Sequence, residues 1–365
     1  FTGSITAFGG SGASFGGAGT IYQKNNAESF GRVTLDNGNN RGTNTVFDSS
    51  SDLLVLGQAI GVLSGTWSGQ NVRVESNGVL RTVSESLATI SVSGDVFVAD
   101  GGVISADGLA KFGSSIGYSS AGLPGGGGSY GGTGGGNPLT PALAYGSVQS
   151  PNAPGSGGGN GSLIGGSYPG GYGGGALKII AGGNVTVNGR LSVDGADGAV
   201  NSGGGSGGGL WISTTLFSGK GLVSAKGGAG NPAGGGGGGG RIGVSFASNN
   251  FTGILTAGGG AGSVGGGAGT VFLKPNSSGG LLLLDNNGLA GTNTPLSSSY
   301  LLPAIPFDLV IRGGASALPL TPLPLLSNLT IGAGASLWMA TNSTTNLFVS
   351  VIRDLTLASG SAIVA

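Results

Sequence analysis

The sequence repeats itself at an offset of 250 residues, and this repeat limits what the chain can fold into. Residues 1–24 and 251–274 are identical at 14 of 24 positions, several of which are not glycine. The likeness weakens further along but continues until Ala106 meets Ala365. The chain therefore contains one copy of a long unit and part of a second.

A shorter repeat of about 30 residues lies inside the long one. A five-residue phrase recurs at equal intervals as LSVDG at 191–195, VSAKG at 223–227 and LTAGG at 255–259. It alternates with a second phrase in which a glycine run enters a short apolar strand, as in GGALKII at 174–180. Equal spacing of equivalent strands predicts that each repeat stacks on the next and buries its apolar face there.

Within the predicted strands, apolar residues alternate with small polar ones. Val185, Val187 and Leu191 face one side of their strands, and Thr186 faces the other. We therefore predict an all-β fold, a parallel β-helix (β-solenoid) with coils of about 30 residues and glycine-rich corners. The alternative is an antiparallel sandwich with turns every ~8–12 residues, which has no reason to repeat at the two longer intervals.

Glycine occupies 86 of the 365 positions and proline 14. Each ordered glycine costs about 0.5–1 kcal/mol relative to alanine, so a folded chain must offset this cost with dense hydrogen bonding and close backbone packing. The glycine runs at 234–240 and 265–267 lie between predicted strands, where we expect ordered corners.

The repeat pattern divides the chain into four stretches. Residues 1–108, 176–250 and 251–365 are predicted to be β-solenoid, the last as a second copy of 1–106. Residues 109–175 are rich in glycine, proline and tyrosine and break the rhythm. They form either a long excursion from one coil, ordered in part, or a polyglycine layer packed along the solenoid with tyrosines as caps.

The charge and residue content exclude several functions. The 14 acidic and 14 basic residues cancel, so the clustered cations that nucleic acid requires are missing. The chain has no histidine and no cysteine, which excludes an imidazole base, disulfides and thiolate zinc sites. No apolar run approaches the ~20 residues of a membrane span, and no glycine run leads into a helix as a nucleotide loop would.

Paired carboxylates would indicate an enzyme, because polysaccharide lyases and hydrolases also use the parallel β-helix. A glycosidase holds two carboxyl groups about 5–9.5 Å apart across a cleft. Asp107 and Asp194 occupy the same position of the five-residue phrase, so they meet only if their coils stack. Nearby Asp100 and Asp197 also precede glycine, as turn residues do, whereas Asp95 does not. We expect turns, with no catalytic residue, no cofactor and no enzymatic activity.

Three weaker kinds of site remain. The segments DNGNN and DNNG begin at Asp36 and Asp285; calcium is the alternative to a simple turn there. Sequons that can carry glycan in a secreted chain occur at Asn160, Asn184, Asn250, Asn276, Asn328 and Asn342. Aromatic residues that form either core or a sugar-stacking surface are Trp67, Trp211, Trp338, Phe217, Phe246, Phe272 and Phe307.

The phrases GGGSGGGLWIS, GLVSAKGGAG, GGGGGGGRIGVSF and FTGILTAGGGAG resemble tandem glycine-rich repeats of very large secreted bacterial surface proteins. The likeness covers residues 176–285 and 1–45. More loosely, the chain is similar to the β-helices of adhesins and autotransporter passengers. The resemblance implies a β-solenoid at the cell surface and carries over no catalytic residues.

We therefore expect an extracellular structural protein, a stiff rod that forms part of a cell-surface fibre, filament or giant adhesin. Its partners would be copies of itself or further repeats of the same chain, joined end to end because an uncapped β-helix exposes strand edges; glycans are a further candidate partner. The alternative is a carbohydrate-binding or polysaccharide-cleaving β-helix. A direct test of the fold is whether the strands at 177–180, 210–213, 242–246 and 270–273 stack in parallel.

Overall fold

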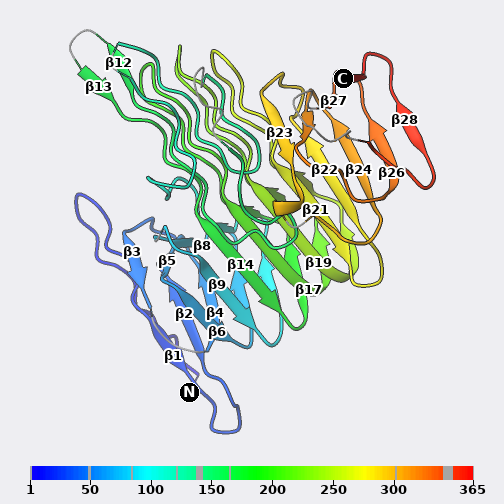
Figure 1. Cartoon of the computed structure of the whole chain (residues 1–365). Helices are drawn as coiled ribbons and strands as arrows, with labels where there is room; N and C mark the ends of the chain where they lie inside the picture. Colours follow the sequence, from blue (N-terminus) through cyan, green and yellow to red (C-terminus); the bar gives the residue numbers. More distant parts are fainter. Residues whose placement is uncertain are drawn as a thin grey trace.

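The computed structural model describes residues 2–47, 51–83, 85–120, 122–136, 143–163, 166–300, 302–339 and 348–364. These residues form an all-β structure whose single helix is a short 3-10 turn at Ser298–Tyr300. The chain advances from one end of the molecule to the other, and the two termini lie far apart (Figure 1). The predicted all-β class is confirmed, and most strand pairs are parallel.

In the described residues the strands form three main sheets and one hairpin. The large sheet contains β1 (Ile21–Gln23), β2 (Arg32–Asp36), β4 (Asp52–Leu56), β6 (Thr66–Gly69), β7 (Val72–Val74), β9 (Ala88–Val92), β10 (Val96–Val98), β14 (Ala176–Ala181), β15 (Asn184–Val187), β17 (Gly209–Gly219), β19 (Arg241–Phe251), β21 (Thr270–Pro275), β22 (Leu281–Asp285), β24 (Phe307–Arg312), β26 (Leu326–Ile331) and β28 (Leu355–Leu357). The side sheet contains β3 (Asn44–Val46), β5 (Ile60–Leu63), β8 (Val79–Thr82), β11 (Val103–Ser105), β16 (Arg190–Ser192), β18 (Leu222–Ser224) and β20 (Ile254–Thr256). The C-terminal side sheet contains β23 (Asn293–Leu296), β25 (Ser316–Pro319), β27 (Ser336–Trp338) and β29 (Ala362–Val364), and the hairpin is β12 (Gly161–Leu163) with β13 (Gly166–Tyr168).

The four strands named in the prediction stack in parallel. Leu177 of β14 pairs with Leu210 of β17, Leu210 pairs with Ile242 of β19, and Ile242 pairs with Val271 of β21. The five-residue phrase stacks in the same way, because Leu191 pairs with Val223 in the side sheet. The parallel register that the repeat spacing predicted is confirmed.

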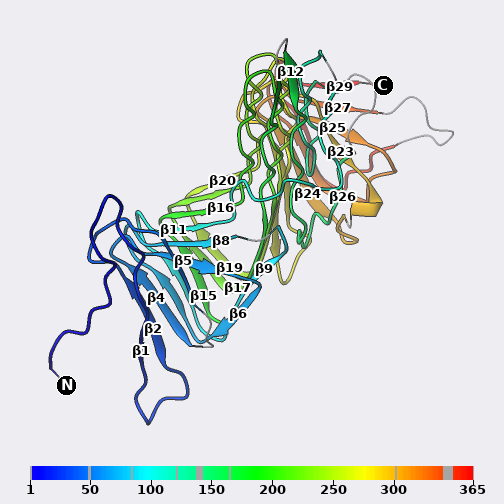
Figure 2. The same ribbon diagram turned by 90° about the vertical axis from the view of Figure 1, so that its left-hand side faces the viewer.

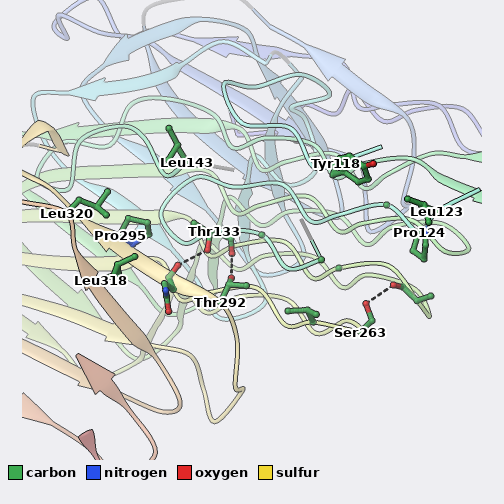
Figure 3. Close-up of a pocket in the computed structure, with 17 residues that line it drawn as sticks. Tyr118, Leu123, Pro124, Thr133, Leu143, Ser263, Thr292, Pro295, Leu318 and Leu320 are labelled. Carbon is green, nitrogen blue, oxygen red and sulfur yellow. Dashed lines mark hydrogen bonds between the residues drawn. The ribbon is translucent and has the colours of Figure 1, made fainter. Parts of the chain in front are cut away.

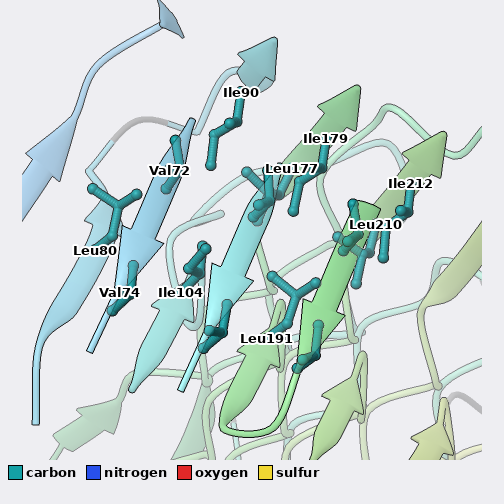
Figure 4. Packing of buried hydrophobic residues seen from close by; sticks show 14 of the residues in the cluster. Val72, Val74, Leu80, Ile90, Ile104, Leu177, Ile179, Leu191, Leu210 and Ile212 are labelled. Atoms are coloured by element: carbon teal, nitrogen blue, oxygen red, sulfur yellow. The ribbon is translucent and has the colours of Figure 1, made fainter. Parts of the chain in front are cut away.

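The core lies between the large sheet and the side sheets. In β15 burial alternates along the strand, so that Val185 and Val187 are fully buried. Leu191 and Ile104 of the side sheet belong to the same apolar cluster (Figure 4). Alternation places one face of each strand in this core and the other outward, which explains the apolar and polar pattern of the sequence.

Two strand pairs in the large sheet are antiparallel, which the sequence did not predict. β1 pairs antiparallel with β2, and β21 pairs antiparallel with β22. The two junctions fall at equivalent positions of the two copies of the long repeat. The direction of the chain in the large sheet therefore reverses once in each copy, at the same point.

We call the number of residues between equivalent positions of neighbouring strands a step. The steps are of two kinds, short and long, and not of the single predicted length. Asp52 contacts Asn71 at a step of 19 residues, and Asn71 contacts Asp95 at a step of 24 residues. Thr186 pairs with Ser218 at a step of 32 residues. The uniform figure of about 30 was thus wrong for the short-step region, because only the long steps contain extra glycine segments.

Candidate functional site

The extra residues of the long steps leave the sheets and return as extended glycine segments. Figures 1 and 2 show them as unlabelled threads that run side by side toward the β12–β13 hairpin. The outgoing segments are 193–198, 225–230 and 257–262, the returning segments are 171–175, 203–208, 234–240 and 265–269, and the covering segments are 125–136 and 155–159. Together they are called the glycine wall below. The glycine runs at 234–240 and 265–267 are ordered and lie between strands, as predicted, but they are segments of this wall rather than corners.

The returning segments 203–208 and 234–240 donate hydrogen bonds to their neighbours in turn, and each returns to the first neighbour after three residues. Gly204 and Gly207 donate to the carbonyl oxygens of Gly235 and Gly238, both at 3.0 Å. The residues between and beside these two donors bond to two other segments. A repeat of three residues with hydrogen bonds between chains is the geometry of polyproline II-like helices. The wall is therefore a hydrogen-bonded bundle rather than a set of loops.

Glycine is required in the segments 203–208 and 234–240 by distance and not by torsion angle. None of the glycines at 203–208 or 234–240 has a positive φ. A Cβ on Gly203 would lie 1.8 Å from the carbonyl oxygen of Gly126, and a Cβ on Gly239 would lie 1.8 Å from that of Ala257. A carbon atom does not fit at such distances, just as only glycine fits at the axis of collagen.

Three segments of the stretch 109–175, namely 125–136, 155–159 and 171–175, belong to this wall. Gly235 and Gly238 of a returning segment donate to Gly125 and Gly128 at 2.9 Å. Of the two interpretations left open, the hydrogen bonds agree with the packed polyglycine layer. Tyr130 is fully buried beside it, so the tyrosines of this stretch are not all surface caps.

A buried asparagine ties glycine segments to the strands in each copy of the repeat, and in the second copy these segments belong to the wall. Asn286 is 1% exposed; its Oδ1 accepts from the Gly259 N–H at 2.7 Å, and its Nδ2 donates to the carbonyl of Gly266 at 3.1 Å. Asn37 makes the equivalent bonds in the first copy and is also 1% exposed. The sequence shows both residues within the repeated Asp-Asn segments, but their amide partners are set by the fold.

The two calcium candidates are the last residues of β2 and β22, next to these asparagines and just before turns. The Oδ1 of Asp36 accepts from the Gly38 N–H at 2.9 Å. Asp285 accepts from the Asn287 N–H at 2.8 Å and from Arg312 Nε at 2.7 Å. No group of three or more acidic, histidine or cysteine side chains occurs in the described residues. The turn interpretation accounts for each of these contacts.

Asp107 and Asp194 do come together, because β11 and β16 are neighbours in the side sheet. One nitrogen of Arg190, Nη2, donates to both carboxylates at 2.9 Å. Asp107 also accepts from the Asp194 N–H at 2.7 Å, and Asp194 accepts from the Lys226 N–H at 2.7 Å. Burial raises the pKa of Asp194, and the charge of Asp107 adds to the rise. Each carboxylate is thus bound to the next step of the chain, a role that needs no substrate.

The other candidate acids lie elsewhere and bind backbone amides one step along. Asp95 accepts from the Asn184 N–H at 2.6 Å, and Asp197 accepts from the Ala229 N–H at 2.7 Å. The carbonyl oxygen of Asp100 accepts from Ser76 Oγ at 2.7 Å. The structure therefore assembles one pair out of the five acids considered.

A polar ladder on the large sheet was missed by sequence reasoning. Asp52 accepts from the Asn71 N–H at 2.8 Å, and Asn71 accepts from the Asp95 N–H at 2.9 Å. The second copy contains the corresponding contacts between Asp308, Asn328 and Asp354. An acid or amide at equivalent positions of successive steps was the available signal, but it lies outside the five-residue phrase.

The sequons fall in different surroundings. Asn160, Asn250 and Asn276 are exposed. Asn184 and Asn328 are half-buried, and the side-chain amide of Asn328 donates to Asp308 at 2.7 Å. Asn342 lies outside the described residues. An accessible amide is what modification requires, so the three exposed sites remain the candidates.

The candidate aromatic residues do not form one surface. Phe217 and Phe272 are fully buried, and Trp67, Phe246 and Phe307 are nearly so. Trp211 is half-buried with Lys178 Nζ 4.3 Å from its ring centroid, and Trp338 is 44% exposed. Most of these rings contribute to the core.

A cavity of about 710 Å³ lies between the glycine wall and the C-terminal side sheet (Figure 3). Its lining is mainly apolar and includes Leu123 and Val264, which adjoin segments of the wall, and Leu318 from β25. Thr292 Oγ1 donates to the carbonyl oxygen of Thr133 at 2.6 Å within it. Its described lining contains no Asp, Glu, Lys or Arg side chain, and Tyr118 is its one phenol.

Comparison with protein-family models, with curated proteins and with solved structures finds no match for this chain. Within the described residues, the only helix is far shorter than a membrane-spanning helix has to be.

Proposed function

We propose that this protein is a structural rod of an extracellular surface fibre. In this proposal the sheets close around the core as a β-solenoid, and each step is one coil. The observation that carries the proposal is the order of strands in the large sheet. They pair with one another in nearly chain order from β1 to β28. Such a ladder transmits load along the molecule through main-chain hydrogen bonds.

The glycine wall supports a stiff rod in the same way. Its segments link three neighbours each, so that bending one coil strains several others. The carboxylates of Asp107 and Asp194 support a structural role, because Asp107 accepts from Arg190 and from the Asp194 N–H, and Asp194 accepts from the Lys226 N–H, and these contacts join one step to the next. The resemblance to secreted bacterial surface repeats supports a location outside the cell.

An exposed sheet edge supports end-to-end partners. In the first copy, Val98 and Ile104 are fully buried because β15 and β16 pair with their strands. Their counterparts in the second copy, Leu357 and Ile363, are 51% and 46% exposed. Open strand edges with apolar side chains pair readily with other strands. We propose that a segment like 184–192, from a further repeat or another copy, covers β28 and β29.

The test combines sedimentation with electron microscopy of the natural full-length protein and of this chain. The proposal predicts rods longer than one repeat unit and concentration-dependent self-association of the chain. Leu357→Lys with Ile363→Lys should abolish the association. The matched control is Ile305→Lys, which replaces an apolar residue that is 51% exposed on a loop and should leave association unchanged.

Dispersed monomers at all concentrations, with no rod longer than one unit, would contradict the proposal. The alternative, a polysaccharide-cleaving or carbohydrate-binding protein, is tested separately with pectin and alginate. Sugar release or retention above that of heat-denatured protein would favour the alternative.

A further inference from the structure

Arg241 is a fully buried cation at the start of β19. Its Nε donates to the carbonyl oxygen of Tyr145 at 2.8 Å, and its Nη1 donates to Thr270 Oγ1 at 3.1 Å. Its Nη2 is buried and has no hydrogen-bond partner in the described structure. The rings of Tyr130 and Tyr300 face the guanidinium group, whose Cζ lies 5.7 and 5.1 Å from their centroids.

No described carboxylate forms an ion pair with Arg241, although four ion pairs occur elsewhere in the described residues. The titratable groups that act on it are the hydroxyls of Tyr130, Tyr145 and Tyr300. Burial raises the pKa of each of these tyrosines, so all three are neutral near pH 7. An arginine stays protonated in a protein, and a buried charge without a counter-ion is strongly unfavourable.

The site is roofed by a strap, defined as residues 143–154, which crosses the outer face of β19. A Cβ on Gly243 would lie 2.7 Å from the carbonyl oxygen of Gln149 in this strap. The strap is held at Tyr145 by Arg241 and at Val148, whose N–H donates to the carbonyl oxygen of Tyr300 at 2.8 Å. The roof separates the guanidinium group from solvent anions unless one is enclosed with it.

We propose that Arg241 binds a small monovalent anion, of which chloride is the physiological example, beneath the strap. The unpartnered Nη2 supplies the hydrogen bond and the guanidinium group supplies the compensating charge. The anion neutralises the charge of Arg241 at the place where the covering segments, β19 and the 3-10 turn at Ser298–Tyr300 meet. This site is independent of whether the chain forms fibres.

The experiment uses bromide as an anomalous scatterer in crystals of the whole chain, together with thermal unfolding. An anomalous peak in contact with Arg241 Nη2 is expected. In solution, the Tm should rise by about 2 °C for each tenfold increase in chloride above the dissociation constant. Gluconate at equal ionic strength should give no such rise.

Arg241→Met should lose the chloride-dependent rise, whereas Arg312→Met, which removes an exposed arginine, should keep it. If Arg241→Met does not fold, the bromide peak and the chloride–gluconate difference in the wild-type chain still decide the matter. A peak only at other places, or a water molecule at Nη2 with equal Tm in chloride and gluconate, would overturn the proposal.

Discussion

Residues 52–105 and 184–256 contribute strands to the same two sheets, yet the number of residues per step differs between the two regions. The short-step region advances from Asp52 to Asn71 with 19 residues and from Asn71 to Asp95 with 24 residues. The long-step region needs 32 residues from Asp194 to Lys226. Strand length does not explain the difference: the side-sheet strands of both regions have three or four residues, and β9 to β10 of the short-step region spans residues 88–98, as long a stretch as β17 at 209–219.

The difference lies in what joins one step to the next. In the long-step region an outgoing and a returning glycine segment stand between β18 and β19, at 225–230 and 234–240. In the short-step region a few residues suffice, as between β8 and β9. The sheets therefore tolerate either connection, and the long glycine runs occur where connections pack against one another.

The largest expected effect comes from a pair of glycines at the same position of the two repeat copies. A Cβ on Gly260 would lie 1.9 Å from the carbonyl oxygen of Gly228, whereas a Cβ on Gly10 meets nothing within 4 Å. Gly260→Ala should lower the free energy of unfolding by about 3 kcal/mol, as severe overpacking does.

Gly10→Ala is the matched control and should change stability by less than about 1 kcal/mol, with stabilisation the expected sign. Both variants are compared by urea unfolding. Equal effects of the two substitutions would contradict the claim that packing in the wall selects glycine.

The second effect concerns the amide that joins wall and strand. Asn286→Ala leaves the half-buried Gly259 N–H and the buried Gly266 carbonyl without this partner. A loss of about 2 kcal/mol is expected, since each unsatisfied buried group costs roughly 1–3 kcal/mol. Asn37→Ala should cost a similar amount, because its contacts are equivalent. A loss below about 0.5 kcal/mol for both, measured by urea unfolding, would show that the amide is dispensable.

The smallest effect is the pH dependence of the Asp107–Asp194 pair. The pKa of Asp194 is raised by burial, so the folded chain holds its proton to higher pH than the unfolded chain. Stability should therefore fall as the pH rises from the usual carboxyl pKa through the raised one. Asp194→Asn should remove that part of the slope in Tm measured from about pH 4 to pH 7, and Asp100→Asn should keep it. A slope unchanged by Asp194→Asn would contradict this assignment.

The strands and their register were predictable because they carry side-chain patterns. The five-residue phrase begins at Leu191 and again at Val223, and these two residues pair in the observed strand register. The short steps were missed because no phrase recurs at a fixed interval there. The packing of the glycine wall was not predictable, since glycine runs carry no pattern that distinguishes one neighbour from another. Gly235 bonds to Gly125, far away in the sequence, through main-chain atoms alone.

Among the candidate sites, too, the contacts that follow from a repeated side-chain pattern were predictable and the others were not. The meeting of Asp107 and Asp194 was predictable on the condition that their steps stack, and they do stack. The role of Arg190 between them was missed, because an arginine before the phrase occurs at only one step. The Asp52–Asn71–Asp95 ladder was also missed, although the second copy repeats it at Asp308 and Asn328.

The central claim is that the glycine segments form a hydrogen-bonded wall as ordered as the sheets. Amide hydrogen exchange of the whole chain, followed by mass spectrometry, tests it most directly. We predict that residues 203–208 and 234–240, which contain no strand, exchange as slowly as β17 and β19. Exchange of these glycines within seconds, at the rate of an exposed loop, while β17 and β19 remain protected, would contradict the account.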